Sequence, residues 1–91
     1  MEEKFLQALS VAREKAVALG VRIRPVTDMA GVHRVLSGHR ESDGFFQLAD
    51  QGRLDLSMEA LAVKKQFTML FSDEEANNAL NRLLTAGYTF K

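Results

Sequence analysis

The chain has 91 residues, of which 46% are hydrophobic and 26% charged, and its formal net charge is zero, so composition indicates one globular domain and argues against disorder. The absence of cysteine excludes disulfides and thiolate metal sites and favours a reducing compartment, so we expect a cytoplasmic protein. No apolar run approaches the ~18 residues of a membrane-spanning helix, and the first ten residues lack the apolar core of a signal peptide, so we expect no membrane partner.

The first part of the chain predicts an amphipathic helix over residues 2–19. Its apolar residues recur at alternating steps of four and three: Phe5, Leu9, Ala12, Ala16 and Leu19. Gly20 ends this pattern. Residues 21–24 then alternate apolar and basic side chains before Pro25, which is typical of a short extended segment. We expect this segment to pair with residues 88–90, the other alternating run, as a two-stranded ribbon.

Two short helices are predicted next, each between a polar cap and a glycine. Thr27 or Asp28 can cap a helix that runs to about Ser37. Ser42 can cap a second helix over residues 43–51. Their expected inward side chains are Met29, Val32, Val35 and Leu36 in the first helix, and Phe45, Leu48 and Ala49 in the second.

The following stretch predicts helix in two pieces. Asp55 or Ser57 can cap a helix over residues 58–64 that buries Leu61. Between residues 65 and 71 the apolar spacing indicates one or two further helical turns, and the local aromatic density predicts a centre of the core.

The most clearly marked helix is expected over residues 73–86, and the earlier helices should gather over it. Ser72 and Glu75 have the spacing of a capping box, and Gly87 can end the helix. Three leucines spaced three and four apart define the expected inward face: Leu80, Leu83 and Leu84. On that basis Leu80→Asp should unfold the domain, because it would place an unpaired charge in the core.

Together these elements predict a mainly α fold, a compact single helical domain over residues 1–91. It should contain five or six short helices and at most the one two-stranded ribbon. Connections of two to five residues between the helices match those of compact helical domains.

Catalytic and metal-binding patterns are not found. The glycines have neither dinucleotide-binding nor P-loop spacing, no serine lies in a G-x-S-x-G turn, and there is no cysteine nucleophile. His33 and His39 have acidic neighbours but lack the spacing of two ligands on one helical face. We therefore predict no catalytic residues, no cofactor and no metal site, and we favour a function other than catalysis.

Basic residues concentrate in one part of the chain. Residues 11–40 hold six basic and two acidic residues, whereas residues 41–91 hold five basic and eight acidic ones. If the basic side chains converge they would attract phosphates, whereas the simpler alternative is a solvated surface on which arginines pair with Glu41 and Asp43. The candidate nucleic-acid-binding residues are Arg22, Arg24, Arg34, His39 and Arg40.

A helix-turn-helix interpretation would make residues 73–86 a recognition helix. Its polar side chains would then face the bases: Asn77, Asn78, Asn81 and Arg82. Recognition helices present their N-terminal residues to the groove, and Asp73, Glu74 and Glu75 would repel the phosphates there. If the protein binds nucleic acid, we expect the basic segment to do so instead.

Four apolar side chains are not all required by the predicted core faces: Phe46, Met58, Met69 and Phe90. Methionine and aromatic residues are frequent at exposed binding surfaces, although in a small domain the same residues often belong to the core. The favoured function is a non-enzymatic interaction module that binds a partner protein, or a second copy of itself, through this apolar patch. Nucleic-acid binding by the basic residues is the alternative.

Overall fold

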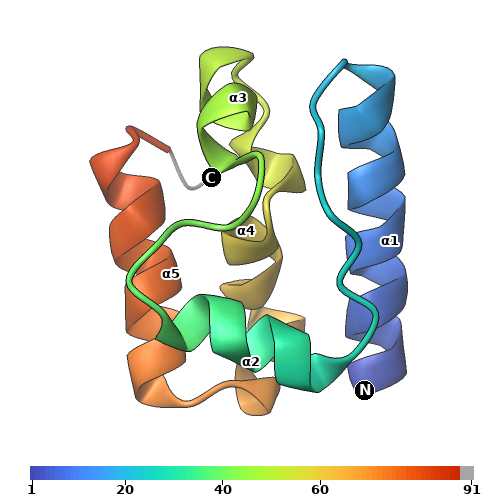
Figure 1. The fold of residues 1–91 in the computed structure, drawn as a ribbon. Helices are drawn as coiled ribbons and strands as arrows, with labels where there is room; N and C mark the ends of the chain where they lie inside the picture. The colour runs from blue at the N-terminus through green and yellow to red at the C-terminus, as the bar shows by residue number, and fades with distance from the viewer. Residues whose placement is uncertain (89–91) are drawn as a thin grey trace.

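Helices dominate the computed structural model, which describes residues 1–88 (Figure 1). In chain order they are α1 (Glu2–Ala18), α2 (Met29–Ser37), α3 (Phe45–Asp50), the 3-10 helix η1 (Leu54–Leu56), α4 (Met58–Ala62), the 3-10 helix η2 (Lys65–Leu70) and α5 (Asp73–Thr85). The predicted mainly α fold is confirmed. No strand is present within the described residues, so residues 21–24 form no ribbon there, and most of their expected partner, residues 89 and 90, lies outside the described part.

The helices are arranged around α4. Figure 1 shows α1 and α5 on the two sides of the molecule, α4 between them, and α2 crossing below. α5 packs chiefly against α4 and α2, and α1 packs against η1 and α4. None of the helices in the described chain combines the length and the apolar character needed to cross a bilayer.

Side-chain caps define where three of the helices begin, namely α2, α4 and α5. Asp28 accepts a hydrogen bond from the Gly31 N–H at 2.8 Å, and Ser57 accepts one from the Ala60 N–H at 3.1 Å. Ser72 and Glu75 form the predicted capping box, with N–H to oxygen distances of 2.9 and 3.2 Å. These bonds satisfy donors that the first turn of a helix leaves free.

The start of α3 differs from the prediction. Ser42 does not cap this helix, because its backbone N–H and its hydroxyl both donate to the buried carboxylate of Glu59. α3 instead begins after Gly44, whose φ of 77° is accessible to glycine at little cost. The helix is shorter than expected at both ends. α4 also ends early, at Ala62, because the backbone is extended at Lys64 before η2 begins.

The core is built from side chains of every long element. Its largest fully buried apolar members are Phe5, Phe45, Leu36, Leu48 and Leu83. Phe5 packs edge-on against both Phe67 and Phe71, with ring centroids 5.1 Å apart in each pair. The aromatic cluster predicted between residues 65 and 71 is therefore part of the core.

The inward face of α5 is not the predicted one. Glu75, Ala79 and Leu83, spaced four apart, are buried. Leu83 was correctly placed, but Leu80 is 36% exposed and Leu84 is 54% exposed, so the prediction is wrong for these two leucines. α5 is turned so that some of its polar residues face α2, as described below. The expectation that Leu80→Asp unfolds the domain therefore loses its basis, because an aspartate there could reach water.

Candidate functional site

A groove with a volume of about 1250 Å³ opens between α1, α2, α3 and the segments that join them. Its charged lining consists of Arg13, Arg24, Arg34, Arg40, Asp28, Glu41 and Asp43. Its apolar lining comes from several elements and includes Leu6, Leu9, Ile23, Val26, Val35, Phe45, Phe46, Leu56 and Met58. The groove therefore combines an apolar surface with guanidinium groups.

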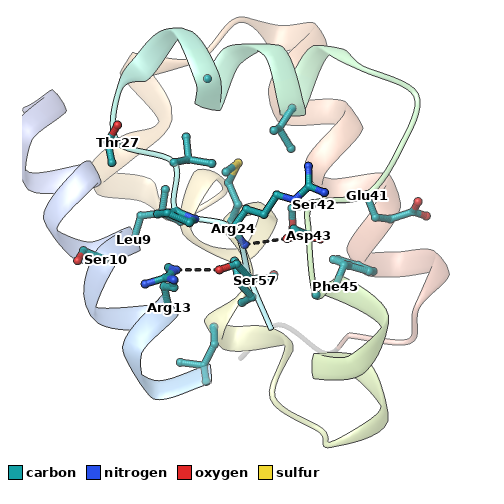
Figure 2. Close-up of a pocket in the computed structure, with 18 of the residues that line it drawn as sticks. Leu9, Ser10, Arg13, Arg24, Thr27, Glu41, Ser42, Asp43, Phe45 and Ser57 are labelled. Carbon is teal, nitrogen blue, oxygen red and sulfur yellow. Dashed lines mark hydrogen bonds between the residues drawn. The ribbon is translucent and has the colours of Figure 1, made fainter. Parts of the chain in front are cut away.

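One wall of the groove is residues 21–28, here called the strap, which crosses between α1 and α3. Arg13 on α1 donates from its Nε to the Ile23 carbonyl at 2.8 Å, and the Arg24 N–H donates to the Asp43 carboxylate at 2.7 Å. Figure 2 shows these two bonds on opposite sides of the strap. A Cβ on Gly44 would lie only 2.7 Å from the Ile23 side chain, so glycine is needed for this close approach. Side-chain bonds and close packing thus hold the strap in place.

A second wall is the loop of residues 38–44, which contacts the strap and is held by α4. Glu59 on α4 is fully buried and accepts the N–H of Ser42 at 2.8 Å as well as its hydroxyl. Arg82 on α5 donates to the same carboxylate at 3.2 Å. Because buried charges are tolerated only when paired and hydrogen-bonded, this carboxylate has the partners it needs.

Arg82 also belongs to a polar seam, which we define as Glu59, Asn78, Arg82 and the backbone of residues 35–38. Arg82 donates to the carbonyls of Val35 at 3.2 Å and Gly38 at 2.7 Å, and Asn78 donates to that of Leu36 at 3.0 Å. The last carbonyls of a helix have no partner within it, so α5 supplies donors to the end of α2. Two side chains considered above as base contacts are therefore part of the packing.

His33 and Glu75 form a second contact between α2 and α5. The His33 Nδ1 lies 2.6 Å from a carboxylate oxygen of Glu75, and the imidazole packs edge-on against Phe71. Burial acts to raise the pKa of the Glu75 carboxyl, but the backbone N–H of Ser72 and the imidazole of His33 outweigh it, so that the pKa lies below its ordinary value. Within residues 1–88 no three histidine or acidic side chains are grouped as metal ligands.

The structure brings together three of the five candidate nucleic-acid-binding residues. Arg24, Arg34 and Arg40 line the groove, whereas Arg22 and His39 are exposed outside its lining. Among residues 1–88 these three arginines form no ion pair. The alternative in which they pair with Glu41 and Asp43 is therefore not what the described structure shows.

Arg13 is a lining residue that the sequence reasoning missed. It is partly buried on α1 and shares the groove with Leu6 and Leu9. The spacings of three and four between these positions place them on one helical face. That spacing is a signal from which the contribution of α1 could have been predicted.

The four candidate partner-binding residues have different positions. Phe46 is 62% exposed, Met58 is buried, and both line the groove. Met69 is 92% exposed on η2, which lies at the bottom of Figure 1, whereas α3 with Phe46 lies at the top. Phe90 lies outside the described residues. The structure thus groups Phe46 with Met58 and separates them from Met69.

No family model, curated protein or solved structure matches the chain. Its functional interpretation therefore rests on the groove and on the residues that line it.

Proposed function

We propose that the protein is a non-enzymatic interaction module that binds a partner protein through the groove. The proposal is supported by the position of Phe46, a largely exposed aromatic side chain in the same groove lining as three arginines that have no ion pair within residues 1–88. Aromatic residues, methionine and arginine are enriched at protein interfaces. An exposed phenylalanine that shares a groove with such arginines is therefore a suitable anchor for a partner.

The size of the groove supports a macromolecular partner. Pockets for small molecules have volumes of roughly 300–1,000 Å³ and enclose most of the ligand. The groove, at about 1250 Å³, is larger, and its lining comes from α1, α2, α3 and both connecting segments. A segment of polypeptide would fill such a groove better than a metabolite. The lack of cysteine favours a cytoplasmic partner.

Nucleic acid is the second candidate, because Arg24, Arg34 and Arg40 line one groove. Two observations count against it. The same lining contains three carboxylates, and the chain as a whole has no net charge, whereas nucleic-acid affinity grows with the number of phosphates neutralised. Partner-protein binding therefore ranks first.

The test is selection from a displayed library of random peptides, followed by titration of the isotope-labelled protein with the selected peptides. The amide signals that shift should belong to the residues that line the groove. Phe46→Ser should weaken binding by about tenfold or more, because truncation of an aromatic anchor that a partner buries costs over ~1.4 kcal/mol.

The matched control is Met69→Ser, which removes an exposed apolar side chain at the other end of the molecule. It should leave the affinity unchanged. The proposal fails if no peptide is selected, or if Phe46→Ser and Met69→Ser have equal effects. Elution of the free protein at twice the monomer mass, lost in Phe46→Ser, would instead assign the groove to a second copy of the chain.

A further inference from the structure

We infer that the groove selects a partner segment in which carboxylate side chains alternate with apolar ones. This inference rests on the proposed function and specifies the chemistry of the partner. Three observations support it. The arginines of the groove form no ion pair within residues 1–88, Asp28 and Asp43 accept hydrogen bonds from the backbone, and the same lining contains apolar side chains.

The arginines of the groove still have donors to offer. Arg24 on the strap, Arg34 on α2 and Arg40 on the loop are exposed and form no ion pair within residues 1–88. The guanidinium group carries five N–H donors in a planar arrangement that matches a carboxylate with two parallel bonds. A carboxylate from a partner would therefore find unused donors on two walls of the groove.

Two of the three acidic residues of the lining accept hydrogen bonds from the backbone, and none of the three forms an ion pair with these arginines within residues 1–88. Asp28 accepts the Gly31 N–H at 2.8 Å, and Asp43 accepts the Arg24 N–H at 2.7 Å. In Figure 2 the Glu41 side chain extends away from Arg24. The carboxylates therefore leave the guanidinium groups open, although they limit the excess of positive charge in the groove.

The numbers of basic and acidic side chains in the lining indicate how many negative charges the partner should carry. The lining has four arginines and three carboxylates. A ligand with a few carboxylates can place each one beside an arginine, whereas the closely spaced phosphates of a nucleic acid would also meet Asp28 and Asp43. Like charges disfavour the polyanion, and specificity arises from such repulsion as much as from attraction.

The apolar part of the lining fixes the remaining side chains of the partner. Leu9, Val26 and Val35 are half-buried within the groove, and Phe46 is largely exposed at its α3 side. Because burial of apolar surface is favourable in proportion to its area, leucine or phenylalanine side chains between the carboxylates would cover these residues. A segment that is only acidic would leave them open to water.

The experiment uses synthetic peptides and full-length protein, with affinity measured by fluorescence anisotropy. The probe has glutamates on both sides of a leucine and phenylalanine core, and its partner peptide carries glutamine in place of each glutamate. The acidic peptide should bind at least about tenfold more tightly, because hydrogen bonds to charged groups contribute over ~1.4 kcal/mol. Its advantage should shrink with added salt.

Charge reversal on the protein supplies the second arm. The double variant Arg34→Glu with Arg40→Glu should reverse the preference, so that a peptide with lysine in place of glutamate binds more tightly than the acidic one. Arg22→Glu is the matched control, since Arg22 is an exposed arginine that does not line the groove. It should leave the order of affinities unchanged. All of these positions are exposed, and thermal melting checks that each variant is folded.

The outcomes separate this inference from the proposed function. Equal binding of the glutamate and glutamine peptides, still lost in Phe46→Ser, would overturn the inference and leave a protein-binding groove. Failure of every peptide to respond to Phe46→Ser would overturn both. Tighter binding of single-stranded RNA than of the acidic peptide, lost in the double variant, would overturn the inference in favour of nucleic acid.

Discussion

The polar seam and the groove both contain arginine, but the surroundings of the arginine differ. In the seam, Arg82 is nearly buried and donates to the Glu59 carboxylate and to two carbonyls at the end of α2. In the groove, Arg34 and Arg40 are exposed and have no ion pair within the described residues. The same side chain therefore completes the fold in one region and remains available to a partner in the other.

The difference shows how to separate structural from functional arginines. A guanidinium that donates to carbonyls at a helix end has a structural task, because the last turn of a helix leaves carbonyl oxygens with unused acceptor capacity. A guanidinium that lines a groove and donates to no acceptor of the protein does not contribute to the fold in this way. Loss of Arg82 should thus affect stability, and loss of Arg34 or Arg40 should affect binding.

The largest expected effect is in the seam. Arg82→Met should lower the free energy of unfolding by about 3–5 kcal/mol, because it leaves the Glu59 carboxylate buried without its cation. The carbonyls of Val35 and Gly38 would also lose donors. Denaturant unfolding at neutral pH measures the change.

Arg34→Met is the matched control for this comparison. It removes the same group from an exposed site, and such substitutions change stability by less than about 0.5 kcal/mol. Equal losses in the two variants would contradict the distinction between the regions. The double variant Glu59→Met with Arg82→Met should regain part of the stability, since both charges leave the interior together.

A smaller effect is expected where the strap meets the loop. Gly44 and Gly52 both have positive φ, at 77° and 69°, but only a Cβ at Gly44 would meet neighbouring atoms, at 2.7 and 2.9 Å. Gly52→Ala should cost roughly 1–2 kcal/mol from backbone strain alone. Gly44→Ala should cost about 2–4 kcal/mol, because overpacking against Ile23 and Val21 adds to the strain.

Thermal or denaturant unfolding of the two alanine variants gives the comparison directly. A loss at Gly44 no greater than at Gly52 would mean that the strap can move away from the loop at little cost. In that case the groove would not be preformed. A larger loss at Gly44 would support a rigid wall that positions Arg24 and Arg40.

Much of the fold could be predicted from local chemistry. Ser72 is the cap that was predicted, Asp28 and Ser57 are each one of two predicted candidates, and the apolar spacing of residues 2–19 corresponds to α1. The inward face of α5 could not be predicted in this way. Spacing alone favours Leu80 and Leu84, whereas the observed rotation of α5 lets Asn78 and Arg82 reach carbonyls on α2.

The candidate site was predictable only in part. The types of residue were present in the sequence, since Phe46, Met58, Arg24, Arg34 and Arg40 all line the groove. Their convergence depends on the paths of the strap and of residues 38–44, which are set by contacts with distant residues such as Glu59. Local patterns contain no information about such contacts, so the sequence suggested two separate surfaces where the structure has one mixed groove.

The smallest expected effect concerns the other contact between α2 and α5, in which Glu75 lies beside His33. Because the pKa of Glu75 is lowered in the folded protein, its contribution to stability is fully present above the ordinary carboxyl pKa of about 4.3 and is lost as the pH falls through the lowered value. Glu75→Gln should therefore be less stable than the unmodified protein at neutral pH, by up to ~1 kcal/mol for a partly exposed pair, and the difference should shrink in acid. Urea unfolding across this pH range measures it, with Glu74→Gln as the exposed neighbouring control. A difference that stays constant with pH would show that Glu75 stabilises the contact between α5 and His33 through shape and neutral hydrogen bonds, and that its charge contributes nothing there.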